Sequence, residues 1–144
     1  MKQYILTMGF LTTLTFTTAA FAADITYRGE IKPLFDARCS SCHGEDSPEY
    51  NVFKQEKQKW ITQDLGPRMD SYTYLAYFTG WPDTGALMRR LDSTKPGNMY
   101  VHLGDTDEER QKNLAIFKGW VGGWTLKRFD ALTKEELAAI KIPY

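Results

Sequence analysis

The apolar residues of this chain recur at helical spacing in several short segments. Over residues 30–38, Ile31, Leu34 and Phe35 fall on one face of a helix. Pro33 suits only the first turn of such a helix, because it cannot donate a backbone hydrogen bond. We therefore expect a short helix at residues 30–38.

Weaker patterns of apolar spacing and capping residues predict further short helices in the middle of the chain. A loop with turn residues Pro96-Gly97-Asn98 is expected over residues 93–104. Residues 52–63 are polar and should be partly helical, with Gly66-Pro67 ending the segment. A second helix is expected over residues 70–79, capped by Asp70 or Ser71 and ended by Gly80. A third is expected over residues 82–91, beginning at Pro82.

The last third of the chain carries the clearest helix signals. Thr106 with Glu109 and Thr133 with Glu136 have the spacing of capping boxes, in which the two side chains satisfy each other's backbone donors. Apolar residues follow the first box at helical spacing: Leu114, Phe117, Trp120 and Val121. No segment shows the alternation typical of a strand, so the predicted fold class is all-α.

The first 22 residues have the pattern of an export signal. Lys2 precedes an apolar run over residues 5–16, and Ala20 and Ala22 are small residues at the positions that signal peptidase reads. We expect cleavage after Ala22, which leaves residues 23–144 as one domain in the periplasm. An uncleaved membrane anchor is the alternative, but the run is short for a span of about 20 apolar residues.

Composition narrows the range of partners. The chain has 18 basic and 18 acidic side chains. Nucleic-acid binding requires a concentrated basic surface, so no nucleic-acid partner is expected. No other segment is apolar enough to cross a membrane. Trp, Tyr and Phe number 4, 8 and 8, a supply that suits a core wrapped around a large flat group.

Both cysteines stand in one short motif, Cys39-Ser40-Ser41-Cys42-His43. A disulfide is the default in an exported protein, but this pair would close a loop too small to stabilise the fold much. A thioredoxin-like site would need a parallel sheet, which the sequence does not predict. A structural zinc site needs four ligands, and His102 is the one further histidine.

The Cys-x-x-Cys-His spacing is also the attachment signal of haem c. The two thiols add across the haem vinyl groups, and the adjoining histidine lies under the iron as the proximal axial ligand. This interpretation uses Cys39, Cys42 and His43, and it agrees with export. Because the motif occurs once, we expect one covalently bound haem c.

With this motif, three segments of the chain resemble the monohaem cytochromes c of class I: 31–44, 95–104 and 109–123. The resemblance covers about residues 31–124 and implies short helices wrapped around the haem. It also implies that the N- and C-terminal helices cross near the haem, bringing Phe35 towards Phe117 and Trp120. Residues 125–144 extend beyond the usual pattern, and we expect an extra packing helix there.

The sixth ligand of the iron decides the chemistry. The resemblance favours Met99, although Tyr100 follows where many family members have proline. Met69 and His102 are the alternatives, and an open or water-bound position is another. Met88 is a further methionine, and a lone methionine is usually a core residue. A thioether raises the reduction potential, whereas a second histidine lowers it.

The resemblance implies a one-electron carrier with redox partner proteins rather than an enzyme. The alternatives are the haem subunit of a larger oxidoreductase, a five-coordinate haem enzyme or gas-binding protein, and a thiol–disulfide oxidoreductase without haem. Arg38, Arg89 and Arg90 are either haem-propionate partners or solvated surface charges.

Overall fold

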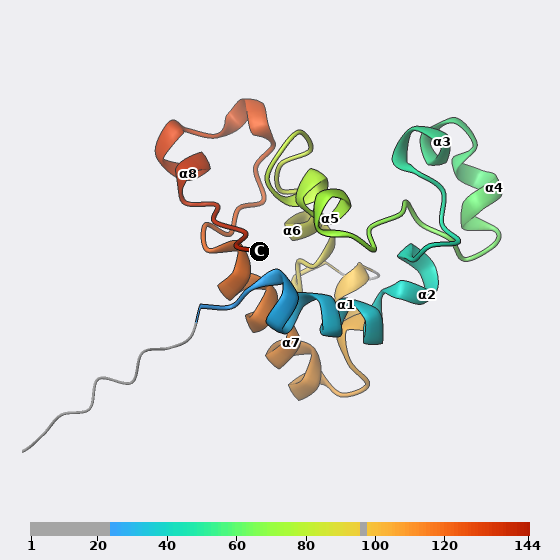
Figure 1. The fold of residues 1–144 in the computed structure, drawn as a ribbon, viewed down its shortest axis with the longest axis horizontal. Coiled ribbons are helices and arrows are strands. Elements are labelled where there is room, and N and C mark those ends of the chain that lie inside the picture. The colour runs from blue at the N-terminus through green and yellow to red at the C-terminus, as the bar shows by residue number, and fades with distance from the viewer. Residues whose placement is uncertain (1–23, 96–97) are drawn as a thin grey trace, which may run out of the picture.

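Short helices make up the described part of the chain, residues 24–95 and 98–144 of a computed structural model (Figure 1). Within these residues, β pairing is limited to one isolated bridge between Gly122 and Ile140. The all-α prediction is confirmed. In chain order the elements are η1 (Tyr27–Ile31), α1 (Lys32–Arg38), α2 (Ser40–His43), α3 (Tyr50–Gln55), α4 (Lys57–Ile61), α5 (Tyr72–Thr79), α6 (Ala86–Arg90), η2 (Met99–Leu103), α7 (Asp107–Val121), η3 (Phe129–Ala131) and α8 (Lys134–Ala138).

Helix α7 organises the core. Its N-terminus is capped by Thr106, whose hydroxyl accepts a hydrogen bond from the Glu109 N–H at 3.1 Å. Its C-terminus is Gly122, which adopts the left-handed φ of 74°. The apolar face packs against η1 and η2. As the sequence predicts, its buried residues include Leu114, Phe117, Trp120 and Val121, and they share one cluster with Ile31 and Phe35.

One predicted capping box forms and the other does not. At α8, Thr133 and Glu136 each accept a hydrogen bond from the other's backbone N–H. At α7, one carboxylate oxygen of Glu109 instead accepts a hydrogen bond from the N–H of Asp105 at 2.9 Å. The other oxygen accepts a hydrogen bond from the Arg38 guanidinium. Glu109 therefore joins α7 to the end of α1, a tertiary contact that the local pattern did not reveal.

Segments in the middle of the chain differ from the prediction. The expected helix over residues 52–63 is two short helices, α3 (Tyr50–Gln55) and α4 (Lys57–Ile61). Helix α6 begins at Ala86 rather than at Pro82, because Gly85 takes a left-handed φ of 75° and becomes the N-cap. The predicted loop 93–104 contains the 3₁₀ helix η2, while Pro96 and Gly97 of its expected turn lie outside the described residues. Helix α5 begins at Tyr72 rather than at Asp70, with Ser71 of the two expected caps as N-cap, and it ends at Gly80 as predicted.

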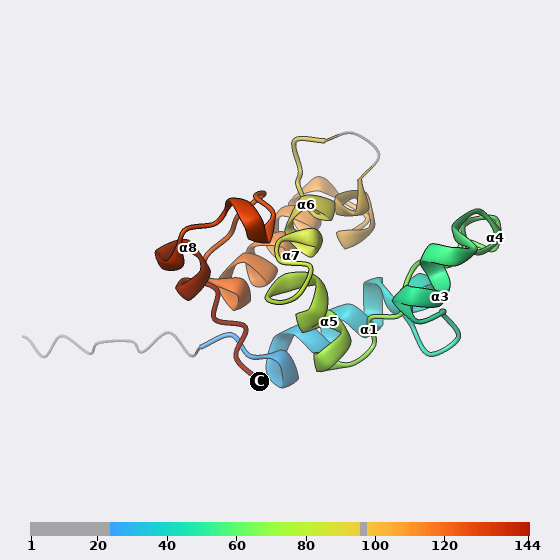
Figure 2. The same cartoon turned by 90° about the horizontal axis from the view of Figure 1, so that it is seen from above.

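Helices α3 and α4 extend away from the rest of the molecule, as the two perpendicular views show (Figures 1 and 2). They follow α2 directly, and the segment after α4 returns to it: the N–H of Gly66 donates to the Cys42 carbonyl at 2.8 Å. This return therefore places the segment after α4 beside the Cys39–His43 motif.

The last residues of the chain return to its beginning, where Figure 1 shows the C-terminus beside η1. The carbonyl of Pro143 accepts two hydrogen bonds, from the Tyr27 N–H at 2.9 Å and from Trp120 Nε1 at 2.8 Å. The Tyr72 hydroxyl donates to the Ile142 carbonyl at 2.9 Å. We call residues 140–144 the C-terminal strap, since it ties η1, α5 and α7 together.

The described residues begin after the predicted export signal. The expected signal segment, residues 1–22, lies outside the described residues. Across residues 24–95 and 98–144, no helix has both the length and the apolar character needed to cross a membrane.

Candidate haem site

The Cys39–His43 motif forms a single helical turn at the junction of α1 and α2. The Cys39 carbonyl accepts hydrogen bonds from the N–H groups of Cys42, at 3.2 Å, and His43, at 2.9 Å. Residues three apart on a helical turn lie on the same face, so both thiols are presented together. No disulfide joins Cys39 and Cys42.

The protonation of Cys39 argues against a thiol–disulfide site. Burial raises the pKa of the Cys39 thiol to about 11, and the neighbouring Cys42 adds to the rise. The attacking cysteine of a redox site needs a lowered pKa, because the thiolate is the nucleophile. Within the described residues, no three Cys, His, Asp or Glu side chains are grouped to hold a metal ion.

The His43 imidazole is held by a backbone carbonyl. Its Nδ1 lies 2.7 Å from the carbonyl oxygen of Pro67, which can accept the Nδ1 proton. Burial lowers the pKa of His43; the Pro67 carbonyl acts to raise it, and the charge of His102 acts to lower it. A neutral imidazole that donates through Nδ1 keeps the Nε2 lone pair available, which is the form that ligates a metal.

Residues 66–69 form the backing of His43. The Met69 N–H donates to the His43 carbonyl at 2.9 Å. A side chain at Gly66 would place its Cβ 2.2 Å from Cε1 of the His43 ring, so only glycine permits this approach. The sequence marked Gly66 and Pro67 as a helix break, and their contact with His43 was missed. The Gly66-Pro67 pair after α4 was the one sequence signal that could have pointed to this contact.

The predicted distal ligand, Met99, opens the 3₁₀ helix η2. Its side chain is 38% exposed. Asn98 holds it in place, accepting from the Met99 N–H at 3.0 Å and donating to the Arg89 carbonyl at 2.6 Å. His102 lies three residues on and is exposed. Because side chains at i and i+3 of a 3₁₀ helix are eclipsed, Met99 and His102 are presented in the same direction.

The other two methionines of the described residues are placed differently. Met88 is fully buried, and its sulfur accepts a hydrogen bond from the Thr125 N–H at 3.0 Å. It is therefore a core residue. Met69 packs half-buried against the core, and its backbone belongs to the segment that backs His43.

Of the three arginines considered either as propionate partners or as surface charges, two are bound to protein groups. Arg38 pairs with Glu109 and, at 3.3 Å, with Asp105. Arg89 pairs with Asp83 at 3.2 Å and donates to the Lys127 carbonyl at 2.9 Å. Among the described residues, Arg90 makes no ion pair or hydrogen bond through its side chain, and it is exposed.

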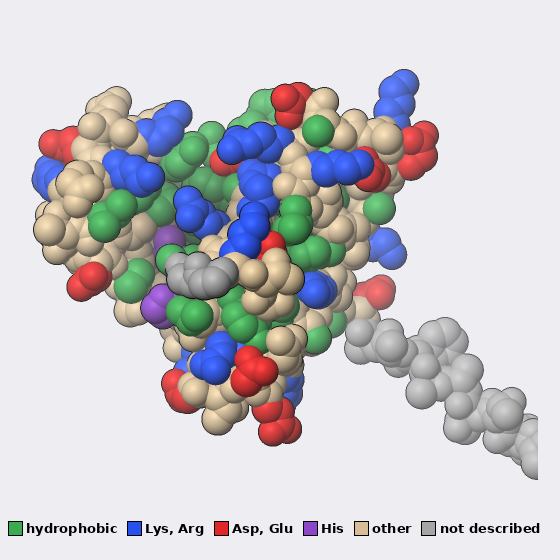
Figure 3. Space-filling view, turned by 180° about the vertical axis from the view of Figure 1, so that it is seen from behind, with side chains coloured by type: hydrophobic (Ala, Val, Ile, Leu, Met, Phe, Trp, Pro, Cys, Tyr) green, Lys and Arg blue, Asp and Glu red, His purple; other side chains and the backbone are tan. Residues whose placement is uncertain are grey.

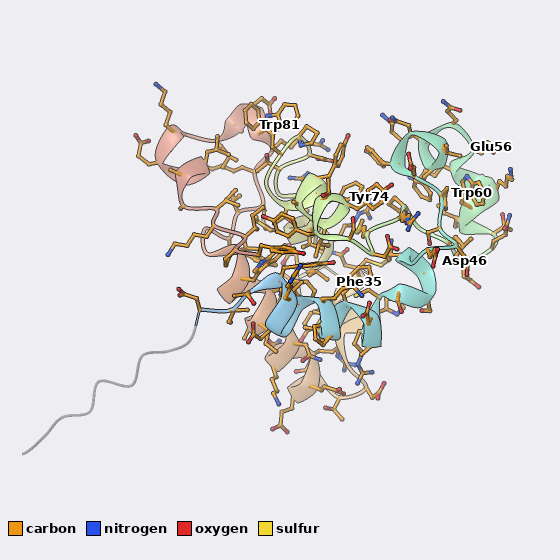
Figure 4. The ribbon with its side chains drawn as sticks, viewed as in Figure 1. Phe35, Asp46, Glu56, Trp60, Tyr74 and Trp81 are labelled. Atoms are coloured by element: carbon orange, nitrogen blue, oxygen red, sulfur yellow. The ribbon has the colours of Figure 1, made fainter. Side chains whose placement is uncertain are left out.

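The residues present fit a haem group. The paired thiols and the neutral histidine supply the groups that attach and ligate a haem. In addition, the indole Nε1–H of Trp60 is buried and has no hydrogen-bond acceptor among the described residues. Trp60 lies on α4, away from Phe35 in the core (Figure 4). On the rear face, hydrophobic side chains line a hollow between the left-hand lobe and the rest of the molecule, with histidine at its lower end (Figure 3).

The helical fold and the single Cys-x-x-Cys-His turn are those of a monohaem c-type cytochrome. Comparison with known proteins agrees: the family described as PccH cytochrome c matches residues 26–144. The chain belongs to this PccH cytochrome c family. Among solved structures, it is similar to the monoheme cytochrome PccH from Geobacter sulfurreducens, with 60% identity, a TM-score of 0.80, and coverage of 85% of this chain and 100% of that chain. No curated protein matches.

Family membership confirms two predictions. The cofactor is a single haem c. The protein belongs to electron transport, and redox partner proteins are implied in general terms. The match also extends through residue 144, so the C-terminal strap is part of the family's domain and not an appendage to it.

Proposed function

We propose that the protein is an exported one-electron carrier. In this proposal Cys39 and Cys42 hold the haem by thioether bonds, His43 ligates the iron from one side, and Met99 ligates it from the other. The observation that carries the proposal is the His43 Nδ1 contact with the Pro67 carbonyl at 2.7 Å. It orients the imidazole and leaves Nε2 available.

The haem would supply the reversible one-electron chemistry. The chain's own residues would fix its position and surroundings. Residues 66–69 hold the His43 ring from behind, and Asn98 anchors the start of η2 to α6. A site with two protein ligands has no position for a substrate, and little has to move when an electron arrives. These properties favour a carrier over an enzyme.

His102 is the second candidate for the distal ligand. It shares with Met99 the exposed face of η2, and its charge is close enough to lower the pKa of His43. Ligation by His102 would keep the carrier function and give a lower reduction potential. An iron without either ligand would instead favour the gas-binding or enzyme alternative.

The periplasm is the proposed location. The pattern of residues 1–22 supports export, and attachment of haem c takes place outside the cytoplasm. A donor and an acceptor protein are required by the function. The same one-electron role would serve either a free carrier or the haem subunit of a larger oxidoreductase.

The test uses the full chain expressed in a host that matures haem c in its periplasm. We expect haem to stay with the polypeptide on a denaturing gel, and a potentiometric titration to follow a one-electron curve. Cys39→Ala and Cys42→Ala should each weaken covalent attachment, whereas the matched change Ser41→Ala within the same turn should not. Haem that is removed by denaturation, or wild-type reduced protein that readily binds carbon monoxide, would contradict the proposal.

A further inference from the structure

Three arginines gather at the junction of α6 and the segment before η3. We call Arg89, Arg90 and Arg128 the arginine cluster. Burial lowers the pKa of Arg89, and the positive charges of Arg128 and Arg90 lower it further, while Asp83 acts in the opposite direction. Asp83 also makes the cluster's ion pair, at 3.2 Å from Arg89. Three guanidinium groups therefore face one carboxylate.

The cluster is held in place through its central member. Arg89 donates to the carbonyls of Thr84, at 3.0 Å, and Lys127, at 2.9 Å. This second bond fixes the backbone next to Arg128 against α6. Arg90 and Arg128 are exposed, and neither makes an ion pair or side-chain hydrogen bond to any described residue. Their charges are available to a further anion.

The cluster is connected to η2, the element that carries the candidate distal ligand. The Arg89 carbonyl accepts from Asn98, and Asn98 in turn accepts from the Met99 N–H. Arg90 is thus one residue from the anchor of η2. On the rear face, Lys and Arg side chains form a band beside the hollow described above (Figure 3).

Tyr50 is a hydroxyl-bearing side chain near the cluster. It begins α3, after the turn in which the Ser47 hydroxyl donates to the Cys42 carbonyl at 2.9 Å. Its ring packs on Phe78 and Tyr77, with centroids 5.0 Å and 5.6 Å apart. Burial raises the pKa of the Tyr50 hydroxyl, as do Asp83 and Tyr77, and the charges of Arg128 and Arg90 counteract the rise. The hydroxyl therefore lies within electrostatic range of both arginines.

We propose that Arg90 and Arg128, together with the Tyr50 hydroxyl, form the site that binds a haem propionate. The site joins the start of α3, which follows His43 along the chain, to the end of α6, which precedes Met99. Two guanidinium groups and a hydroxyl supply the donors that a carboxylate needs. The inference rests on the haem attachment proposed above.

This assignment gives the C-terminal extension a direct role at the cofactor. The sequence suggested Arg38, Arg89 and Arg90 as propionate partners. The structure commits Arg38 and Arg89 to protein acceptors and adds Arg128, which lies 29 residues after Met99 in sequence beyond the helix that ends the class I pattern. Residues 125–128 therefore carry a cofactor contact as well as packing.

The experiment compares four variants of the matured holoprotein: Arg90→Gln, Arg128→Gln, the double variant, and Lys134→Gln as the matched control. Lys134 is exposed on α8, which Figures 1 and 2 place far from α2–α4. Each variant is first checked for covalent haem and for the wild-type optical spectrum. Loss of either would count against the haem attachment or ligation, and not against the propionate site.

The readout is the reduction potential, measured at low and at high ionic strength. Removing a positive charge beside the haem destabilises the reduced state relative to the ferric state. We expect the ratio of reduced to oxidised protein at a fixed potential to fall about fivefold in the double variant. The effect should persist in high salt, because a contact ion pair is screened less than separated surface charges. Tyr50→Phe should shift the ratio in the same direction by less.

Equal potentials in the double variant and in Lys134→Gln would overturn the proposal. A second arm measures the rate of oxidation by ferricyanide, an anion. If this rate falls in the double variant while the potential stays unchanged, the cluster serves encounters with anionic partners, and the propionate assignment is wrong.

Discussion

The His43 imidazole and the Pro67 carbonyl are joined across 24 residues by a contact of 2.7 Å between Nδ1 and the oxygen. The chain reaches this position because the segment after α4 turns back onto α2, with Gly66 bonded to Cys42 and Met69 bonded to His43. The carbonyl holds the ring in one orientation and one tautomer. Any change that displaces residues 66–69 should therefore act on the candidate ligand.

Gly66→Ala tests the backing of His43. The new Cβ would lie 2.2 Å from Cε1 of the imidazole, so either the ring or the segment must move. We expect a loss of about 1–3 kcal/mol in the free energy of unfolding, as for other overpacked sites, and a lower fraction of low-spin haem. Denaturant unfolding and the optical spectrum measure the two effects.

Gly80→Ala is the matched control for this change. There the added Cβ meets the tip of the Ile142 side chain at 3.0 Å, which can move aside. We expect the control to keep its spectrum. If Gly66→Ala also leaves the spectrum and the stability unchanged, residues 66–69 do not hold the imidazole.

Removal of the C-terminal strap tests its role in stability. A chain ending at Ala139 would lose the Pro143 carbonyl and leave the Tyr27 N–H and the buried Trp120 Nε1–H without their acceptor. We expect the free energy of unfolding to fall by about 3–5 kcal/mol. Urea denaturation of the holoprotein, followed by circular dichroism, measures this.

Tyr144→Ala separates the strap's backbone from its last ring. The Tyr144 ring stacks on Tyr27 at 5.9 Å but is 55% exposed, so its loss leaves the Pro143 carbonyl in place. We expect less than half the effect of the truncation. An unchanged unfolding midpoint in the truncated chain would show that the strap is dispensable.

Asp70 should make stability depend on pH. Its carboxylate accepts from Arg68 Nε at 2.7 Å and Nη2 at 2.9 Å, and this bonding lowers the pKa of Asp70. A folded-state pKa below the unfolded value contributes stability above about pH 4, which is lost as pH falls through the folded pKa. Because solvent screens this ion pair, Asp70→Asn should cost at most about 1 kcal/mol at neutral pH and progressively less in acid.

The control for this pH dependence is Asp130→Asn, at an exposed carboxylate of η3 with no ion pair among the described residues. It should change the unfolding free energy little at either pH. A difference between Asp70→Asn and the wild type that stays constant from pH 7 down to pH 3 would contradict the linkage.

Met99→Ala tests the distal ligand. Without the thioether, the reduced iron should bind carbon monoxide, and the reduction potential should fall. Met69→Ala and His102→Ala are the comparisons, and neither should open the iron. If His102→Ala alone admits carbon monoxide, the ligand is His102 and the carrier has two histidine ligands.

Local sequence signals predicted the elements that depend on neighbouring residues. Ser71, Thr106 and Thr133 cap the helices that they were expected to cap, since a cap needs only backbone donors two or three residues away. The Cys39–His43 motif likewise predicted the family and the single haem c. Helix α6 was misplaced by four residues because Gly85, not Pro82, determines where it begins.

Long-range contacts could not be predicted from the pattern. Pro67 lies 24 residues from His43, and Glu109 leaves its capping box for Arg38, 71 residues away. The strap residue Pro143 meets Tyr27 near the other end of the chain. Each of these depends on how the helices pack, which neither periodicity nor spacing specifies. The ligand choice between Met99 and His102 stays open in sequence for the same reason.

An optical spectrum of the matured wild-type protein, oxidised and reduced and extended into the far red, tests the central claim most directly. His43 and Met99 as ligands predict a low-spin c-type spectrum with the weak thioether-to-iron charge-transfer band in the oxidised form. A low-spin spectrum without that band would assign the distal position to His102. High-spin features would show an open iron and contradict the electron-carrier account.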